Sequence, residues 1–211
     1  MSIGYDSSKL PPITNLQDLL IPGFKGRVAL KGDPGVSSTA LNGVMMAALA
    51  SGGVPDDISK GVDFFHRLKV GGNLAPIPAT TSTVRNGATT VVFDWDYLSV
   101  AYGQDIPRWK VVIPTYAVVG GYFAQAINRK APHPAAARLW EEYLYSDAGQ
   151  NVWLQGGVRP VRMDAMHSAR TLDSTAAAAF PPANGTTVFL SPEQVTAARL
   201  YLAGHWAQAI G

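Results

Sequence analysis

The stretch from Ile113 to Val161 constrains the fold most, because it encodes two successive helices with clear boundaries. Pro134 suits the first position of a helix, where its missing N–H is not needed, and His133 would then lie at the cap. The residues that follow recur at spacings of three and four and predict one broad apolar face: Leu139, Trp140, Tyr143 and Leu144. A β-prone run with Tyr116 and Tyr122 precedes this helix.

The second helix of this stretch begins after Ser146, whose hydroxyl is a typical N-cap. Asp147 would lie in its first turn, where a negative charge suits the helix dipole. Gly156-Gly157 would end it.

Composition indicates a globular protein and excludes several classes. The chain has 211 residues, of which 47% are hydrophobic and 15% charged, and its net charge is only +2. Such a balance gives no basic patch, so nucleic acid is not expected as a partner. The absence of cysteine excludes thiolate metal sites and disulfides. No segment approaches the roughly 20 apolar residues of a membrane span.

Short strands and helices alternate along the rest of the chain, which indicates an α/β fold. A capping box at residues 14–17 and another at 191–194 would start two helices. The predicted helices are 15–20, 39–50, 56–69, a short one capped by Thr80 or Thr81 and ended by Asn86-Gly87, and a terminal one to Ile210 with Val195, Ala198, Leu202 and Trp206 facing inward. The predicted strands are 27–30, 73–78, 89–93 and 111–114, and residues 163–179 form a weak helix or a loop.

The chain resembles the type II solute-binding proteins of ABC importers, in their iron, polyamine and phosphonate branch. Most of the likeness lies in IPTYAVVGGYFAQAINRKAPHPAAARLWEEYLYSDAGQNVWLQGGVRPV. IGYDSSKLPPITNLQDLLIPGFKGRVAL and NGATTVVFDWDYL agree with it, so the similar segments extend from Ile3 to Val161. The family pattern also includes a signal peptide and most of a first lobe, roughly 100 residues, which these 211 residues lack. We therefore expect a shortened chain.

The resemblance implies an α/β fold of the type II periplasmic binding protein class, with a mixed sheet flanked by helices. Residues 3–114 and 180–211 would form the second lobe, and 115–179 a remnant of the first lobe with the hinge return. The implied function is capture of a small polar organic solute in an interlobe cleft, with permease subunits of an ABC transporter as partners. The implied location is periplasmic or extracellular. A ferric-iron or polyamine-specific member is the alternative, and a homodimer through exposed lobe surface is a further expectation.

Two clusters are candidates for ligand binding. The first consists of Ser37, Ser38 and Thr39 at a helix start, where free N–H groups, hydroxyls and the dipole would hold a carboxylate or phosphate. The same residues are also ordinary N-caps, and the two roles are compatible.

The second cluster consists of Asp94, Trp95, Asp96 and Tyr97 at the end of a buried strand, with Tyr116 and Tyr122 near the hinge. Aromatic faces and carboxylates would suit an amine, although a strand end with core aromatics is the plain structural alternative. Alternation along a strand puts Trp95 and Tyr97 on one face. The resemblance favours that face for the cleft, since relatives place aromatics there, and the departure from paired tyrosines argues against ferric iron. A zwitterion would satisfy both clusters.

No catalytic motif occurs in the sequence. GVSST lacks the second glycine of a nucleophile elbow, and there is no HExxH and no P-loop lysine. The four histidines are too far apart for a local metal motif. We therefore expect no enzyme activity, no metal site and no cofactor. The competing hypothesis is a transferase of this fold, similar to porphobilinogen deaminase, which would need a reactive cysteine or an equivalent nucleophile.

Overall fold

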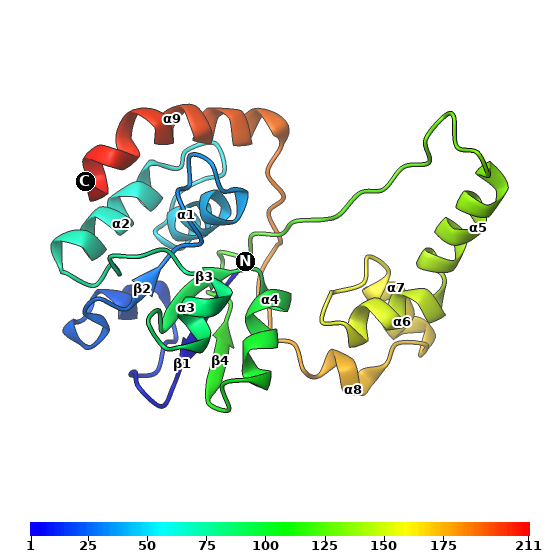
Figure 1. Ribbon diagram of the computed structural model, residues 1–211, viewed down its shortest axis with the longest axis horizontal. Helices are drawn as coiled ribbons and strands as arrows, with labels where there is room; N and C mark the ends of the chain where they lie inside the picture. Colours follow the sequence, from blue (N-terminus) through cyan, green and yellow to red (C-terminus); the bar gives the residue numbers. More distant parts are fainter. The chain divides into compact units, whose positions relative to one another are not determined.

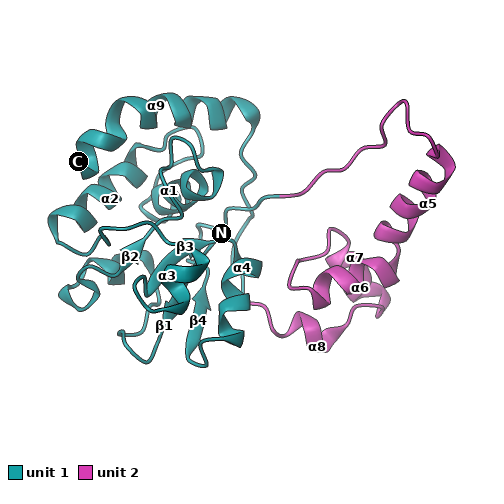
Figure 2. Ribbon diagram, viewed as in Figure 1, with its two compact units in different colours: residues 1–121, 181–211 teal, residues 122–180 magenta.

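The computed structural model describes residues 1–211 (Figure 1). The chain forms two compact units (Figure 2): unit 1 comprises residues 1–121 and 181–211, and unit 2 comprises residues 122–180. The chain therefore leaves unit 1 at residues 121/122 and returns at 180/181, compared with expected lobe boundaries at 114/115 and 179/180. That the units correspond to lobes stays a prediction.

A four-stranded mixed sheet lies at the centre of unit 1 (Figure 1). Its strands are β1 (Ser2–Asp6), β2 (Val28–Ala29), β3 (Val91–Asp94) and β4 (Trp109–Val112), in the order β2-β3-β1-β4. β1 is antiparallel to both β3 and β4, whereas β2 is parallel to β3. The mixed sheet flanked by helices confirms the predicted α/β class.

Successive residues of β3 face two different cores, as the alternation of a strand requires. Val91 and Phe93 belong to the larger core, together with Ile3 and Tyr5 of β1. Val92 faces a smaller core on the other side of the sheet.

Three helices supply the larger core: α1 (Ser38–Ala50), α2 (Ser59–Val70) and α9 (Pro192–Ile210). Phe65 of α2 is the aromatic centre, since its ring centroid lies 5.3 Å from that of Phe93 and 5.5 Å from that of Trp206. α1 and α2 pack closely at Gly61, where an added Cβ would lie 2.1 Å from the Val44 carbonyl oxygen. Glycine is therefore required at this helix crossing.

The smaller core is covered by α3 (Thr81–Arg85), α4 (Asp96–Ala101) and the 3₁₀ turn η3 (Tyr102–Gln104). Gly4 of β1 faces this side, and an added Cβ would lie 2.6 Å from the Trp109 ring. The indole of Trp109 thus packs directly over the β1 backbone. Two further 3₁₀ turns, η1 (Leu16–Leu20) and η2 (Pro22–Phe24), connect β1 to β2.

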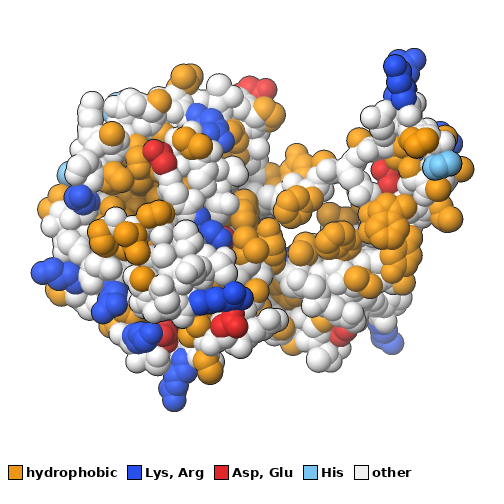
Figure 3. All heavy atoms as spheres, viewed as in Figure 1, with side chains coloured by type: hydrophobic (Ala, Val, Ile, Leu, Met, Phe, Trp, Pro, Cys, Tyr) orange, Lys and Arg blue, Asp and Glu red, His pale blue; other side chains and the backbone are white.

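Unit 2 contains α5 (Pro134–Tyr145), α6 (Asp147–Gln155), α7 (Met163–Ala169) and α8 (Ser174–Ala177). It has a small interior: α5 contributes no buried residue, and Leu154 and Met166 are the buried large apolar side chains. Hydrophobic side chains gather over α5 and α6 (Figure 3), and the exposed ones are Leu139, Trp140, Tyr143, Tyr145, Val152 and Trp153. Polar contacts hold the turns together, such as the Arg162–Asp147 ion pair of 2.9 Å.

Most predicted helix boundaries are confirmed. His133 precedes α5 without a side-chain cap, Ser146 caps α6, Thr80 caps α3, and Ser191 and Gln194 form the capping box of α9. Ala198, Leu202 and Trp206 are buried, whereas Val195 is only partly buried. None of these helices is long and apolar enough to span a membrane.

Three local predictions are wrong. The first capping box is formed by Asn15 and Asp18, not by Thr14 and Gln17, because the Asp18 carboxylate reaches back to the Asn15 N–H. Residues 73–78 form no strand beyond a bridge of Leu74 to Val28. The run from Tyr116 to Tyr122 is also not a strand, since only Val119 pairs there, with Val188.

Candidate ligand-binding site

β2 and β3 run parallel, so their carboxyl ends lie at one edge of the sheet, which we call the carboxyl edge. Lys31 follows β2 and Asp94 ends β3, and the Lys31 Nζ lies 2.9 Å from the Asp94 Oδ2. The other carboxylate oxygen of Asp94 accepts the Trp95 N–H at 2.8 Å. The Asp94 side chain is fully buried and the Lys31 side chain is 22% exposed. Both carboxylate oxygens of Asp94 therefore have protein partners.

The charges of this pair are set by burial and by each other. Burial raises the pKa of the Asp94 carboxyl, and the hydrogen bond and charge of Lys31 offset only part of that effect. Burial alone would lower the pKa of Lys31, but the hydrogen bond and charge of Asp94 outweigh it and raise that pKa. Burial and the charge of Asp94 also raise the pKa of Tyr97. At neutral pH the edge thus presents a charged lysine beside an un-ionised phenol.

The loop after Lys31 leads into the first turn of α1. The Asp33 backbone carbonyl closes a turn by accepting the Ser37 N–H at 2.7 Å. The Ser37 hydroxyl caps the helix by accepting the Ala40 N–H at 3.2 Å. Arg199 of α9 supports the loop through a 2.8 Å hydrogen bond to the Gly35 carbonyl. Because an N-cap satisfies only part of a first turn, the N–H groups of Ser38 and Thr39 lie outside the intrahelical hydrogen-bond ladder. Ser38 is exposed and Thr39 half-buried.

The predicted alternation of side chains over residues 94–97 is wrong, because β3 ends at Asp94 and α4 begins at Asp96. Trp95 is the N-cap residue of α4, and it is half-buried, as are Asp96 and Tyr97. The Trp95 ring lies against the backbone of Gly121, where an added Cβ would be 2.7 Å from it. The structure therefore places these three side chains in the turn between β3 and α4.

The two predicted tyrosines lie in different units. Tyr116 belongs to unit 1, is 82% exposed and has a left-handed backbone with φ of 64°. Tyr122 belongs to unit 2 and is also exposed. Of the predicted residues, unit 1 thus holds two groups that follow the parallel strands along the chain: Ser37, Ser38 and Thr39 at the start of α1, after β2, and Asp94, Trp95 and Tyr97 at the end of β3 and the start of α4.

The family model of the bacterial extracellular solute-binding proteins matches residues 1–185. The chain belongs to this family. A search of the curated proteins found no significant match.

Three solved structures share the fold of this chain. An ABC transporter structure from Clostridium perfringens ATCC 13124 has a TM-score of 0.65 at 16% identity, over 100% of this chain and 66% of that chain. The sulfate-binding protein SubI from Mycobacterium tuberculosis H37Rv has a TM-score of 0.67 at 18% identity, over 92% and 64%. An extracellular solute-binding protein from Bordetella parapertussis has a TM-score of 0.70 at 13% identity, over 100% and 66%. The chain thus spans 64–66% of the length of these structures.

Lys31 is the edge residue that the sequence analysis missed. Its signal was a lysine directly after a predicted strand, in the loop that leads to the serine-rich helix start. Its partner could not be inferred, because Asp94 lies 63 residues further along the chain. No group of three or more His, Asp or Glu side chains in the structure could hold a metal ion.

Proposed function

We propose that this chain captures a small polar organic solute bearing an oxyanion group at the carboxyl edge of unit 1, as the solute-binding component of an ABC importer. The supporting observation is that Asp94 is buried and that each of its carboxylate oxygens already has a protein partner, one of them Lys31. The carboxylate expected to attract an amine is therefore already neutralised.

The groups that remain for a solute are mostly hydrogen-bond donors. The Lys31 ammonium hydrogen-bonds Asp94 and Tyr102, which leaves one of its three donors for a solute. The first turn of α1 offers the N–H groups of Ser38 and Thr39 with the favourable end of the helix dipole. Trp95 and Tyr97 would add ring surface for the body of the solute, and Tyr116 and Tyr122 stay further proposed contacts. Asp94 would position Lys31 and would not itself contact the solute.

The names of structurally similar proteins span several ligand classes: sulfate for SubI, ferric iron for a Bordetella protein, spermidine and putrescine for PotD from Streptococcus pneumoniae, and thiamin for a periplasmic binding protein. The fold therefore does not determine which ligand is bound, and the hydrogen-bond donors at the carboxyl edge must determine it. A polyamine is the competing candidate, because Trp95 and Tyr97 also suit a cation.

A thermal melt of the 211-residue chain tests this proposal, with aminoethylphosphonate, a sugar phosphate, spermidine, thiamine and ferric citrate as ligands. A ligand at about 100 times its dissociation constant adds roughly 2.7 kcal/mol to the free energy of unfolding. We expect a shift with an oxyanion ligand. A shift with spermidine alone would support the polyamine candidate instead, and a flat response to all would refute capture by this chain.

Ser38→Asp separates binding from folding. A carboxylate in the first turn of α1 favours the helix dipole and should raise the melting temperature slightly. The same charge repels an oxyanion at that turn, so the ligand-induced shift should disappear. Ser59→Asp adds an equal charge to the first turn of α2 and should leave the ligand-induced shift intact.

A further inference from the structure

The apolar face of α5 is not packed by the rest of the chain. The helix contributes no buried residue between Pro134 and Tyr145. The exposed fractions are 72% for Leu139, 57% for Trp140 and 45% for Tyr143. Isolated helices shorter than about 12–15 residues are marginal in water, and a helix in a protein is stabilised mainly by packing its apolar face. A partner that covers this face would therefore stabilise α5.

The three exposed side chains form one stripe along α5, which we call the α5 stripe: Leu139, Trp140 and Tyr143. They lie on one face because residues three and four apart on a helix are neighbours. The Trp140 and Tyr143 rings are stacked, with centroids 5.6 Å apart and an angle of 29° between their planes. Figure 3 shows the hydrophobic side chains gathered over this helix. Trp and Tyr often dominate the binding energy of protein–protein interfaces, so the stripe has the composition of an interface.

Two opposite charges border the α5 stripe on one side. Arg138 and Glu142 are four residues apart, so they lie on the same side of the helix, and each directly precedes a residue of the stripe. Both side chains are exposed, and neither makes an ion pair within the chain. They lie two residues before and two residues after Trp140.

This spacing is self-complementary for two antiparallel copies of α5. If the two Trp140 side chains lie opposite each other, Arg138 of each copy lies opposite Glu142 of the other copy. The same pairing then occurs twice, as a two-fold symmetric interface requires. A parallel pair would instead place Arg138 opposite Arg138. The charges therefore favour a second copy of this chain in the antiparallel direction.

The area is sufficient for a weak dimer. A large aromatic side chain can bury about 150–250 Å², so the exposed parts of the α5 stripe and its two bordering charges amount to on the order of 500 Å² per copy. Two copies would bury about 1,000 Å², which is near the lower limit for a specific interface. We therefore expect a micromolar dissociation constant.

We propose that a second copy of this chain covers the α5 stripe, in a two-fold symmetric dimer with antiparallel α5 helices. The stripes pack against each other, and the Arg138–Glu142 pairs between copies set the direction and the register. The interface belongs to unit 2, whereas the carboxyl edge belongs to unit 1, so this proposal does not rest on the proposed solute.

Sedimentation equilibrium of the 211-residue chain, from low micromolar to several hundred micromolar, tests the proposal. We expect a reversible monomer–dimer equilibrium, and a monomer over the whole range would overturn it. Leu139→Glu should weaken the dimer by at least about tenfold, because it places a charge in the apolar centre of the interface. Leu200→Glu is the matched control, since Leu200 of α9 is also 72% exposed but belongs to unit 1. Equal losses in the two variants would overturn the assignment to α5.

Charge reversal tests the antiparallel register. Arg138→Glu and Glu142→Arg should each weaken the homodimer about tenfold, because each places like charges opposite each other twice. An equimolar mixture of the two variants should dimerise nearly as tightly as the parent chain, since the variants carry complementary charges at these positions. A mixture that associates no better than either variant alone would overturn the antiparallel pairing. Melts of the dilute variants should match that of the parent chain, because both substituted side chains are exposed.

Discussion

Lys31 and Asp94 form a 2.9 Å ion pair across 63 residues of sequence. The pair joins the end of β2 to the end of β3, at the edge where we propose solute binding. Because Asp94 is fully buried, its charge is tolerated only with its partners in place.

Lys31→Met should lower the free energy of unfolding by about 3–5 kcal/mol at pH 7, because it leaves a buried carboxylate without its counter-ion. The double variant Lys31→Met/Asp94→Asn should recover most of this loss. Denaturant unfolding of the single and double variants measures both effects. Equal losses in the single and double variants would mean that the pair is not the source of the destabilisation.

The loss in Lys31→Met should also depend on pH. Burial raises the pKa of Asp94 and Lys31 offsets part of that rise, so removal of Lys31 should raise the folded-state pKa further and make protonation stabilise the variant more than the parent chain. The stability of Lys31→Met relative to the parent chain should therefore increase as the pH falls from 7 to about 5. A deficit that stays constant over this range would contradict the assignment.

Ser37→Ala should cost about 1 kcal/mol of stability, because the Ser37 hydroxyl accepts the Ala40 N–H at the start of α1. Ser38→Ala is the matched control. The Ser38 side chain is exposed and makes no capping bond, so its removal should change stability by less than about 0.5 kcal/mol. Thermal melts of both variants measure the difference in stability. Equal losses in the two variants would mean that the Ser37 hydroxyl does not cap α1.

Asp18→Asn should lower stability by about 1 kcal/mol at neutral pH and by nothing in strong acid. Burial would raise the pKa of Asp18, but hydrogen bonds from Thr14 and Asn15 outweigh it and lower that pKa. A lowered pKa contributes stability that is present above the unfolded value and lost as the pH falls through the folded one. Unfolding free energies of both proteins from about pH 5 to pH 2 should converge, and a constant gap would contradict this.

Gly61→Ala should destabilise unit 1 by about 1–3 kcal/mol, because its Cβ would lie 2.1 Å from the Val44 carbonyl oxygen at the crossing of α1 and α2. Gly204→Ala is the control, since Gly204 lies within α9 with open space around it. This change should stabilise the protein by about 0.5–1 kcal/mol. Melts that shift in the same direction would contradict the close packing at Gly61.

The helices could be predicted from sequence because their signals are local. Pro134, Ser146 and the 191–194 box act within one turn, and each marks a boundary that the structure confirms. The strands were harder to predict, because pairing partners are distant. β1 was not predicted at all: Gly4 and Asp6 interrupt its β-prone pattern, yet it pairs on both sides, as β3 does.

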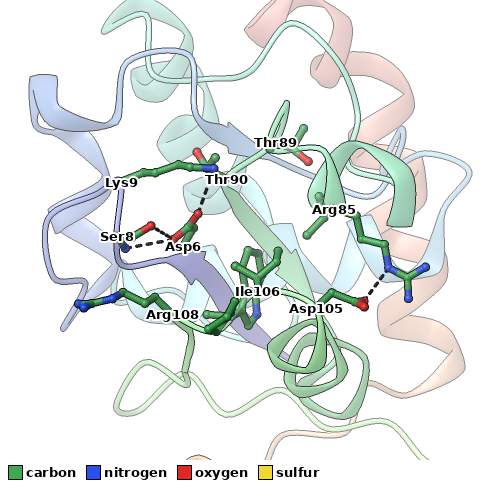
Figure 4. A pocket seen from close by; sticks show the side chains of 13 residues that line it. Asp6, Ser8, Lys9, Arg85, Thr89, Thr90, Asp105, Ile106 and Arg108 are labelled. Atoms are coloured by element: carbon green, nitrogen blue, oxygen red, sulfur yellow. Dashed lines mark hydrogen bonds and ion pairs between the residues drawn. The ribbon is translucent and has the colours of Figure 1, made fainter.

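The carboxyl edge, too, could be predicted from the sequence only in part. Its serine and aromatic residues could be proposed from their positions after predicted strands, and α1 and α4 do begin after β2 and β3. The role of Asp94 could not be predicted, because burial and the ion pair to Lys31 depend on how β2 meets β3. A cavity at the other end of these strands (Figure 4) is lined by residues from three separate segments, within 6–9, 84–90 and 105–109, which have no sequence pattern in common.

The central position of β1 has a consequence for the order in which the protein folds during synthesis. β1 leaves the ribosome well before its two partners, which are residues 91–94 and 109–112. At roughly 5–20 residues per second, the first partner of β1 is synthesised several seconds after β1 itself, and α9 follows later still. Ile3 and Tyr5, both buried in the finished core, stay uncovered during this interval. A nascent chain of this topology therefore presents an apolar strand that chaperones can bind before the sheet closes.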